Sequence, residues 1–418
     1  MTRLARADLL AHLQSQVFTA PPMASLTPRR IGAEVELIPL DASSGRRVPL
    51  DAESGIAVLP FLRRFAARQG WGEARTPKGV PCFVVRGGGT IGFEPGGQIE
   101  FSTPPARSVT AVLDRLRSVV GPLRAAAAAE GIELLSSGVD PHNGQDDAPL
   151  LLDAKRYQRM AEHFARIGPF GAVMMRQTAS IQVNLDFDDE PRLRWRLLNA
   201  VAPYVTAIFA SSPVYEGAAT GHQSFRAHAW RRLDPARTGL PFDAARPVEA
   251  YLRFALSAPA MLFPTVGGHS LPFGEWLVRA NPTLEEWETH LSTLFPEVRP
   301  RGHCEVRSAD AVDPVWYAAP LVFLAGLAYD PHAARSALDL APMADAGLLE
   351  RAGREGLRDT GIARTATQLF ELALAGCGAL GPSFVHPSHL EEARLFFDRY
   401  TRRGRAPADD LISTAIAA

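Results

Sequence analysis

The stretch that decides the fold runs from Ile91 to Pro104 and reads IGFEPGGQIEFSTP. It places one glutamate before a Gly-Gly turn and another after it. After the turn, Gln98, Glu100 and Ser102 alternate with apolar residues, which predicts a strand with one apolar face and one acidic face. A carboxylate on a strand otherwise built for burial costs free energy unless a partner compensates its charge. The stretch therefore predicts a sheet whose polar face binds something positively charged.

Three other segments combine an apolar face with a polar face in the same way. From Ile31 to Leu37, apolar residues alternate with two glutamates that would lie about 7 Å apart on one side of the strand. The stretch MMRQTASIQVNLDF, residues 174–187, has the cleanest alternation in the chain, and residues 303–307 alternate likewise. The polar residues of interest on these predicted strands are Glu34, Glu36, Thr178, Gln182, Asn184, Glu305 and Arg307.

Helical patterns surround the predicted strands. From Ser108 to Glu130, apolar residues recur at spacings of three and four, which predicts an amphipathic helix. Residues 314–418 are almost wholly helical in pattern. We expect Ser211 to Pro247 to form a long irregular region and Ala250 to Phe254 a strand or short helix. Because the apolar side of an antiparallel sheet packs on helices, the sequence predicts an α+β fold with a shared polar surface on the other side.

Length and composition are those of an ordinary globular protein. We expect a single domain over residues 1–418, with an N-terminal helix and connector at 1–30 and a helical region at 315–418. A formal net charge of −1 gives no field that attracts nucleic acid or an anionic membrane surface. Three widely spaced cysteines suggest no disulfide framework, which favours the cytoplasm. The longest apolar stretch, Val315 to Tyr329, is shorter than the roughly 20 residues that span a bilayer, so we expect a buried helix.

The shared polar face has the chemistry of a metal and phosphate site. Glutamate recurs on three segments, and mutual repulsion makes that arrangement costly unless cations bind there. Oxygen ligands favour a hard cation, and Mg²⁺ above others if phosphates complete its shell. Arg307 beside Glu305 is suited to phosphate oxygens, because a guanidinium binds two of them in a fork. The sequence contains no G-x-x-x-x-G-K-[ST] loop, so any use of ATP has to rely on another phosphate site.

The quoted motifs resemble those of a known family. In order and spacing, the segments RRIGAEVEL, GFEPGGQIEFS, MMRQTASIQVNLDF and THLSTLFPEVRPRGHCEVRSADA are similar to the plant and bacterial type-2 glutamate–cysteine ligases. The branch it resembles most is the bacterial one that includes the ligase of ergothioneine assembly. The resemblance implies a glutamine-synthetase-like fold, with a curved antiparallel sheet and helices on its outer face. It also implies ATP-dependent formation of a γ-glutamyl phosphate, two or three Mg²⁺ ions, and glutamate and cysteine as substrates.

The resemblance also implies roles for individual residues. Glu100, Glu305 and Arg307 match catalytic positions, and Glu36 and Arg307 match positions at ATP. The implied metal ligands are Glu34, Glu36, Glu94, Glu100 and Glu305. The implied substrate-binding residues are Gln98, Thr178, Gln182, Asn184 and Arg299.

Three alternatives remain open at this level. The same fold and chemistry could join glutamate to a different amine, since no residue selecting cysteine is identified. A second alternative is an inert binder or regulator that retains the acidic surface, although a binder does not need several metal ligands. Arg307 itself has an alternative role as an ion-pair partner of Glu305, because the two side chains share a strand face. The protein is expected to be a monomer or homodimer.

Overall fold

The computed structural model describes residues 4–19, 29–76, 79–187, 190–241, 243, 245–265 and 269–417. Most of the predicted connector between Thr19 and Arg30 lies outside these residues. The strands are β1 (Ile31–Asp41), β2 (Gly72–Arg75), β3 (Pro81–Val84), β4 (Thr90–Phe93), β5 (Ile99–Ser102), β6 (Ile132–Leu135), β7 (Ile181–Leu185), β8 (Val214–Tyr215), β9 (Ala218–Ala219), β10 (Val298–Pro300) and β11 (Cys304–Val306).

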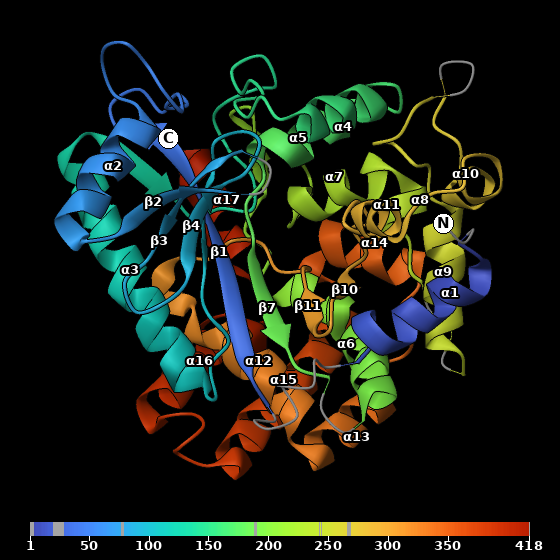
Figure 1. The fold of residues 1–418 in the computed structure, drawn as a ribbon. Coiled ribbons are helices and arrows are strands. Elements are labelled where there is room, and N and C mark those ends of the chain that lie inside the picture. Colours follow the sequence, from blue (N-terminus) through green and yellow to red (C-terminus); the bar gives the residue numbers. More distant parts are fainter. Residues whose placement is uncertain are drawn as a thin grey trace.

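Nine of the described strands form one sheet (Figure 1). Its order is β10, β11, β7, β1, β5, β4, β3, β2, and β6 pairs with the C-terminal half of β1. Every pairing in the sheet is antiparallel, so the predicted sheet type is confirmed. The quoted stretch supplies β4 and β5, and β5 lies directly beside β1. The glutamate-bearing strands β1 and β5 are therefore neighbours in the sheet.

The helices account for most of the remaining chain. They are α1 (Arg6–His12), α2 (Val58–Gln69), α3 (Val109–Ala129), α4 (Lys155–Ala165), α5 (Phe170–Gln177), α6 (Pro191–Ile208), α7 (Phe225–Leu233), α8 (Pro235–Thr238), α9 (Pro247–Ser257), α10 (Phe273–Arg279), α11 (Leu284–Leu291), α12 (Ala318–Tyr329), α13 (Pro331–Leu340), α14 (Ala346–Arg354), α15 (Thr360–Leu380), α16 (Pro387–Arg399) and α17 (Pro407–Ala417). A π-helical turn, Leu13–Val17, continues α1, and 3₁₀ turns cover Pro314–Trp316, Gly356–Arg358 and Thr401–Arg403.

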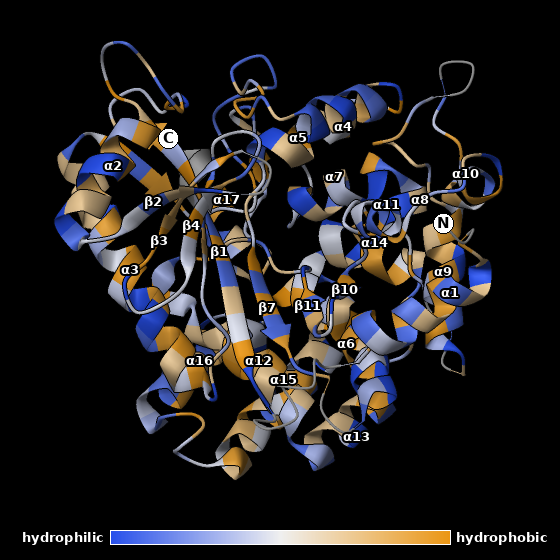
Figure 2. Ribbon diagram, viewed as in Figure 1, coloured by the Kyte–Doolittle hydropathy of each residue, from blue (hydrophilic) through white to orange (hydrophobic). Residues whose placement is uncertain are grey.

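The two faces of the sheet differ as the alternation predicts. On β1, Ala33, Val35 and Leu37 are at most 1% exposed and belong to the main apolar core. Helices α3, α6 and α12 pack against this side of the sheet. Helix α12 is buried along its whole length, as predicted for the longest apolar stretch, and it carries mostly hydrophobic colours in Figure 2. The glutamates of β1 and β5 point to the opposite side of the sheet.

The apolar core is continuous from the N-terminal helix to the C-terminal helices. One cluster of buried side chains includes Leu9 of α1, the apolar face of the sheet, and Phe396 of α16. This continuity supports a single domain over residues 1–418, which stays a prediction. None of the described helices combines the length and apolar character needed to cross a bilayer.

The predicted strand over residues 174–187 is too long at its start. Residues 174–177 are the last turn of α5, and β7 begins only at Ile181. Helix α5 packs closely on α4, where a Cβ on Gly171 would lie 2.1 Å from Phe164 Cβ. This tertiary contact holds the segment as a helix, and the alternation extends only from Thr178 onward.

The prediction of a long irregular region from Ser211 to Pro247 is wrong. The segment contains the β8–β9 hairpin and the helices α7 and α8. Ser224 caps the N-terminus of helix α7, because its Oγ accepts a hydrogen bond from the Ala227 backbone N–H at 3.0 Å. The adjoining Ala250 to Phe254 segment belongs to helix α9. Strands β2 and β10 and helix α10 were not predicted, because each is too short for a periodic pattern.

The Gly-Gly turn between β4 and β5 makes a close contact that sequence reasoning did not find. Gly97 has a positive φ of 83°, and a Cβ on Gly96 would lie 2.2 Å from the Arg176 carbonyl oxygen. Gly96→Ala is therefore expected to lower the free energy of unfolding by at least about 2 kcal/mol, measured by urea denaturation. Gly121→Ala in α3 is the control, because no atom lies within 4 Å of its Cβ position. That control should be neutral or stabilising by up to about 1 kcal/mol.

Candidate active site

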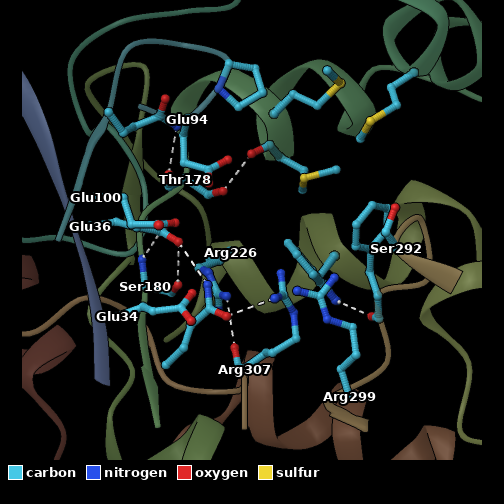
Figure 3. A pocket seen from close by; sticks show the side chains of 18 of the residues that line it. Glu34, Glu36, Glu94, Glu100, Thr178, Ser180, Arg226, Ser292, Arg299 and Arg307 are labelled. Atoms are coloured by element: carbon cyan, nitrogen blue, oxygen red, sulfur yellow. Dashed lines mark hydrogen bonds between the residues drawn. The ribbon is translucent and has the colours of Figure 1, made fainter. Parts of the chain in front are cut away.

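A cavity of about 440 Å³ lies between the polar face of the sheet and the helices α4, α5 and α7. Figure 3 shows Glu34, Glu36, Glu94 and Glu100 on one side, the acidic wall, with Arg299 and Arg307 across from them in the basic wall. The residues lining it are Glu34, Glu36, Glu94, Pro95, Gln98, Glu100, Ser102, Arg156, Tyr157, Met160, Met174, Met175, Thr178, Ser180, Gln182, Arg226, Trp230, Ser292, Phe295, Arg299, Arg301 and Arg307.

The acidic wall is a direct consequence of strand register. Glu36 on β1 is paired with Glu100 on β5, so their side chains leave the sheet side by side. The turn after β4 adds Glu94, and one carboxylate oxygen from each of the three residues lies within 4.8 Å of the others. Gly92 on β4 is opposite Glu100, and a Cβ there would meet no atom within 4 Å, which leaves the space in front of the carboxylates open.

Neighbouring polar groups hold these carboxylates in place. Glu36 accepts hydrogen bonds from the Ser180 backbone N–H at 2.8 Å, the Ser180 hydroxyl at 3.0 Å and the Gln182 amide at 3.0 Å. Glu34 accepts one from the Asn184 amide at 3.1 Å, and Glu100 accepts one from the Ser102 hydroxyl at 2.9 Å.

Crowding and burial change how the carboxyl groups of the acidic wall titrate. Burial, followed by the charge of Glu36, raises the pKa of Glu94 to about 7. Burial and the charges of Glu34 and Glu94 raise the pKa of Glu100 well above its ordinary value. Burial and the charge of Glu305 raise the pKa of Glu34.

The basic wall is built around Glu305, which is completely buried. Three guanidinium groups contact its carboxylate: Arg299 at 2.8 Å, Arg301 at 3.3 Å, and Arg307 in a short ion pair. Burial alone would raise the pKa of Glu305, but Arg299 and Arg307 hold it well below its ordinary value. Glu305 is therefore a fixed negative charge that orients the arginines.

Arg307 makes several contacts at once. It ion-pairs with Glu305 as one alternative anticipated, and it also donates a hydrogen bond to the Gln182 Oε1 at 2.8 Å. Its guanidinium lies over the Trp230 ring, 5.2 Å from the ring centroid. Its Nε is buried without a hydrogen-bond partner among the described residues. The group is held rigidly at the cavity with one donor still unused.

The sequence patterns did not predict the cavity residues that lie on helices α7 and α4, opposite the sheet. Arg226 and Trp230 stand one helical turn apart on α7, and the guanidinium of Arg226 lies 5.2 Å from the Trp230 ring centroid. On α4, Arg156 donates to the Ser292 Oγ at 2.8 Å and lines the cavity with Tyr157. The i, i+4 spacing of Arg226 and Trp230 is the one signal of this helix face in the sequence, and it is too short to stand out within a segment predicted to be irregular.

Most of the site residues predicted from the sequence line this one cavity. Those lining the cavity are Glu34, Glu36, Glu94, Gln98, Glu100, Thr178, Gln182, Arg299 and Arg307. Glu305 lies beneath the arginines instead of on the cavity wall. Asn184 lines a neighbouring cavity of about 290 Å³, which shares Glu34 and Arg301 with the first. Thr178 lies at the end of α5 and not on β7, and its carbonyl accepts from the Gln98 amide at 2.9 Å.

The donor set fits a hard divalent cation. The carboxylates of the acidic wall provide oxygen ligands, and the described residues lining the cavity include neither histidine nor cysteine. Gln98 is 1% exposed, and its Oε1 has no hydrogen-bond partner among the described residues, so it is free to meet a bound group. Chemically, an acidic wall facing an arginine wall can hold cations and anionic oxygens next to each other.

Comparisons with known proteins agree with the geometry. Glutamate–cysteine ligase EgtA of Mycolicibacterium smegmatis is 35% identical over 350 residues, which are 79% of each chain. The chloroplastic glutamate–cysteine ligase of Brassica juncea is 32% identical over 354 residues, which are 81% of this chain and 66% of the plant chain. A crystal structure of glutamate–cysteine ligase from Francisella tularensis in complex with AMP has the same fold, with a TM-score of 0.55, 12% identity, and coverage of 93% of this chain and 85% of the other.

The family model described as glutamate–cysteine ligase family 2 matches residues 30–414. This match covers all the strands of the sheet and every residue of both cavity walls. The resemblance inferred from the sequence motifs is confirmed, and so is the predicted α+β fold class. The chain belongs to glutamate–cysteine ligase family 2.

Proposed function

We propose that this protein joins the γ-carboxylate of L-glutamate to the amine of L-cysteine, with conversion of ATP to ADP and phosphate. The product, γ-glutamylcysteine, supplies low-molecular-weight thiol biosynthesis of the ergothioneine or glutathione type. Family membership supports the reaction, and two relatives above 30% identity carry the name glutamate–cysteine ligase. The observation that carries the proposal is the acidic wall facing the arginine wall across one cavity.

The chemistry proceeds in two balanced steps. An oxygen of the γ-carboxylate attacks the terminal phosphorus of ATP, so that ADP leaves and a γ-glutamyl phosphate forms. The cysteine amine then attacks the acyl carbon, loses a proton, and displaces phosphate as the C–O bond breaks. Phosphoryl transfer of this kind depends mainly on positioning and on neutralising charge. Arg307 and Arg299 are the groups we assign to the anionic oxygens.

Bound Mg²⁺ supplies charge neutralisation on the phosphates of ATP. We assign two or three ions to the carboxylates that line the cavity, those of Glu34, Glu36, Glu94 and Glu100. Among these, Glu36, Glu94 and Glu100 each present one carboxylate oxygen within 4.8 Å of the others. Glu305, the fifth ligand implied by the resemblance, is buried against three arginines and is assigned to holding them in place. We assign ATP to Glu36 and Arg307, and the amino-acid substrates to Gln98, Thr178, Gln182, Asn184 and Arg299. The apolar side of the cavity, formed by Met160, Met175, Trp230 and Phe295, suits the small thiol side chain.

The test is ADP release with a panel of amines and a product mass for each. We expect ADP to form with glutamate and cysteine together, and much more slowly with glutamate alone. If another amine replaces cysteine with a higher kcat/KM, the alternative with the same chemistry but a different product is correct. Absence of amine-dependent ADP formation with every amino acid would contradict the ligase proposal and favour a binder.

Removal of Mg²⁺ has an expected effect that depends on pH. In the native state the pKa of Glu94 is about 7, against 4.5 for an unperturbed glutamate, so the native state binds more protons than the unfolded state between these values. Without Mg²⁺, the contribution of Glu94 to stability is therefore lost as the pH rises through this window. Bound Mg²⁺ offsets the repulsion between ionised Glu94 and its neighbours Glu36 and Glu100. The rise in Tm that Mg²⁺ causes should therefore be larger at about pH 7.5 than at about pH 5.5.

Thermal unfolding with EDTA or Mg²⁺ at the two pH values measures this effect. Glu133→Gln is the matched control, because Glu133 is exposed on β6, and it should keep the full pH dependence. Glu94→Gln should reduce the difference between the two pH values in the rise in Tm. An equal rise in Tm at both pH values would contradict the assignment of Mg²⁺ to these carboxylates.

We also propose a cytoplasmic location, in keeping with three free cysteines, of which Cys304 and Cys377 are buried. The expectation of a monomer or homodimer stays a prediction that light scattering would test.

A further inference from the structure

A second group of metal-ligand side chains lies outside the active-site cavity. His222, His228 and Glu350 each present one ligand atom within 4.8 Å of the others. His222 lies in the loop after β9, His228 is on α7, and Glu350 is on α14. None of the three lines the cavity described above. The chain thus brings two imidazoles and a carboxylate together from three separate segments.

The ring of His222 is fixed in one tautomer. Its Nδ1 lies 3.1 Å from the Thr220 carbonyl oxygen, which only accepts hydrogen bonds, so Nδ1 carries the hydrogen. The lone pair of the neutral ring is therefore on Nε2. A histidine ligand of a metal commonly donates its other ring N–H to a backbone carbonyl in this way.

One ring nitrogen of His228 takes part in no hydrogen bond among the described residues. Its Nδ1 is buried without a hydrogen-bond partner among the described residues and lies 4.0 Å from Glu350 Oε1. Its ring stacks on Phe225 at 5.5 Å and lies 4.1 Å from the His222 ring. Burial and the nearby His222 lower the pKa of His228 to about 4, so the ring is neutral at neutral pH.

Glu350 is ionised and partly exposed. Burial would raise its pKa, but the hydrogen bond from Arg232 holds it below the ordinary value. Arg232 contacts the carboxylate at 3.2 and 3.3 Å, and its side chain is 42% exposed, so it can turn away into solvent. Arg231, at 4.0 Å from the carboxylate, is engaged by Glu297 at 3.0 Å. Arg232 is therefore the main competitor of a cation at this carboxylate.

We propose that His222, His228 and Glu350 bind a transition-metal cation of the Zn²⁺ class, with water completing the shell. Two imidazole nitrogens and one carboxylate oxygen are a ligand set that Zn²⁺ takes, whereas Mg²⁺ prefers oxygen alone. The site is separate from the magnesium assignment and does not depend on the proposed reaction. One of its ligands, His228, is on α7, the helix whose Arg226 and Trp230 line the active-site cavity. A metal ion bound to His228 and Glu350 links helix α7 to helix α14.

The experiment titrates the full-length chain with Zn²⁺ in excess Mg²⁺, which occupies the acidic wall. We expect one equivalent of Zn²⁺ to bind, and His228→Gln or Glu350→Gln to weaken it by at least about 10-fold. Arg232→Gln should bind Zn²⁺ as well as or more tightly than the parent, because it removes the competitor. His332→Gln, at an exposed position on α13, is the matched control and should bind normally.

A second measurement does not depend on the folding of any variant. X-ray absorption of the unmodified chain with one equivalent of Zn²⁺ should show two imidazole ligands and only nitrogen and oxygen neighbours. Absence of Zn²⁺ binding at millimolar concentration, or a spectrum without imidazole, would overturn the proposal. So would equal affinities in the parent, His228→Gln and Glu350→Gln.

Discussion

Replacing Glu100 with glutamine is expected to lower kcat about 10³-fold, because the variant loses a negative charge at the centre of the acidic wall. Glu100 is paired with Glu36 in the sheet, and a carboxylate oxygen of each lies within 4.8 Å of one of Glu94. The amide keeps the size of the side chain, and its oxygen can still accept from the Ser102 hydroxyl. The measurement is the rate of ADP formation at saturating glutamate, cysteine and ATP.

The fold of Glu100→Gln should be at least as stable as the parent without Mg²⁺. Burial and like charges raise the pKa of Glu100, so the charged form is unfavourable in the native state and the substitution removes repulsion. Glu133→Gln, with the same change at an exposed position, should retain parent activity. A variant with normal kcat would show that Glu100 holds no catalytic cation. A variant that has lost both activity and a cooperative unfolding transition would assign Glu100 to folding.

Replacing Arg307 with lysine is expected to lower kcat by about 10²–10³-fold, even though the positive charge is kept. Lysine cannot reproduce the planar group that contacts Glu305 and Gln182 while lying over the Trp230 ring. It also lacks the fork that binds two anionic oxygens together. Stopped-time assays of kcat and of KM for ATP measure the loss.

The Arg307→Lys variant should still fold, because Glu305 keeps its contacts with Arg299 and Arg301. No buried charge is left without a partner, which is the usual cause of severe destabilisation. Arg335→Lys, at a side chain that is 63% exposed, is the control and should be fully active. If Arg307→Lys lost stability but kept kcat, Arg307 would be only an ion-pair partner of Glu305.

The sheet and its acidic wall could be predicted because both depend on local alternation. Period two places Glu34 and Glu36 on one face of β1 whatever the rest of the chain does. The same alternation predicts that Glu100 on β5 and Gln182 on β7 lie on the polar face of the sheet. Which glutamates face each other depends on register, and the pairing of Glu36 with Glu100 is set by the strand order, which no single segment encodes.

The remaining parts of the site depend on tertiary packing. Residues 174–177 are helical because α5 packs on α4 through Gly171, a contact absent from any local pattern. Arg226 and Trp230 reach the cavity because Asp310 accepts hydrogen bonds from the Ser212 and Ser224 hydroxyls at 2.6 and 2.9 Å and fixes the start of α7. These serines are 98 and 86 residues away from Asp310 in the sequence, and only the folded chain brings them together.

The most direct test of the ligase account uses glutamate labelled with ¹⁸O in its γ-carboxylate. The labelled substrate is incubated with ATP, Mg²⁺ and cysteine, and the products are analysed by mass spectrometry. If a γ-glutamyl phosphate forms in this cavity, one ¹⁸O atom appears in the released phosphate and the other stays in the γ-amide of γ-glutamylcysteine. Release of unlabelled phosphate, or no ADP that depends on cysteine, would contradict the account.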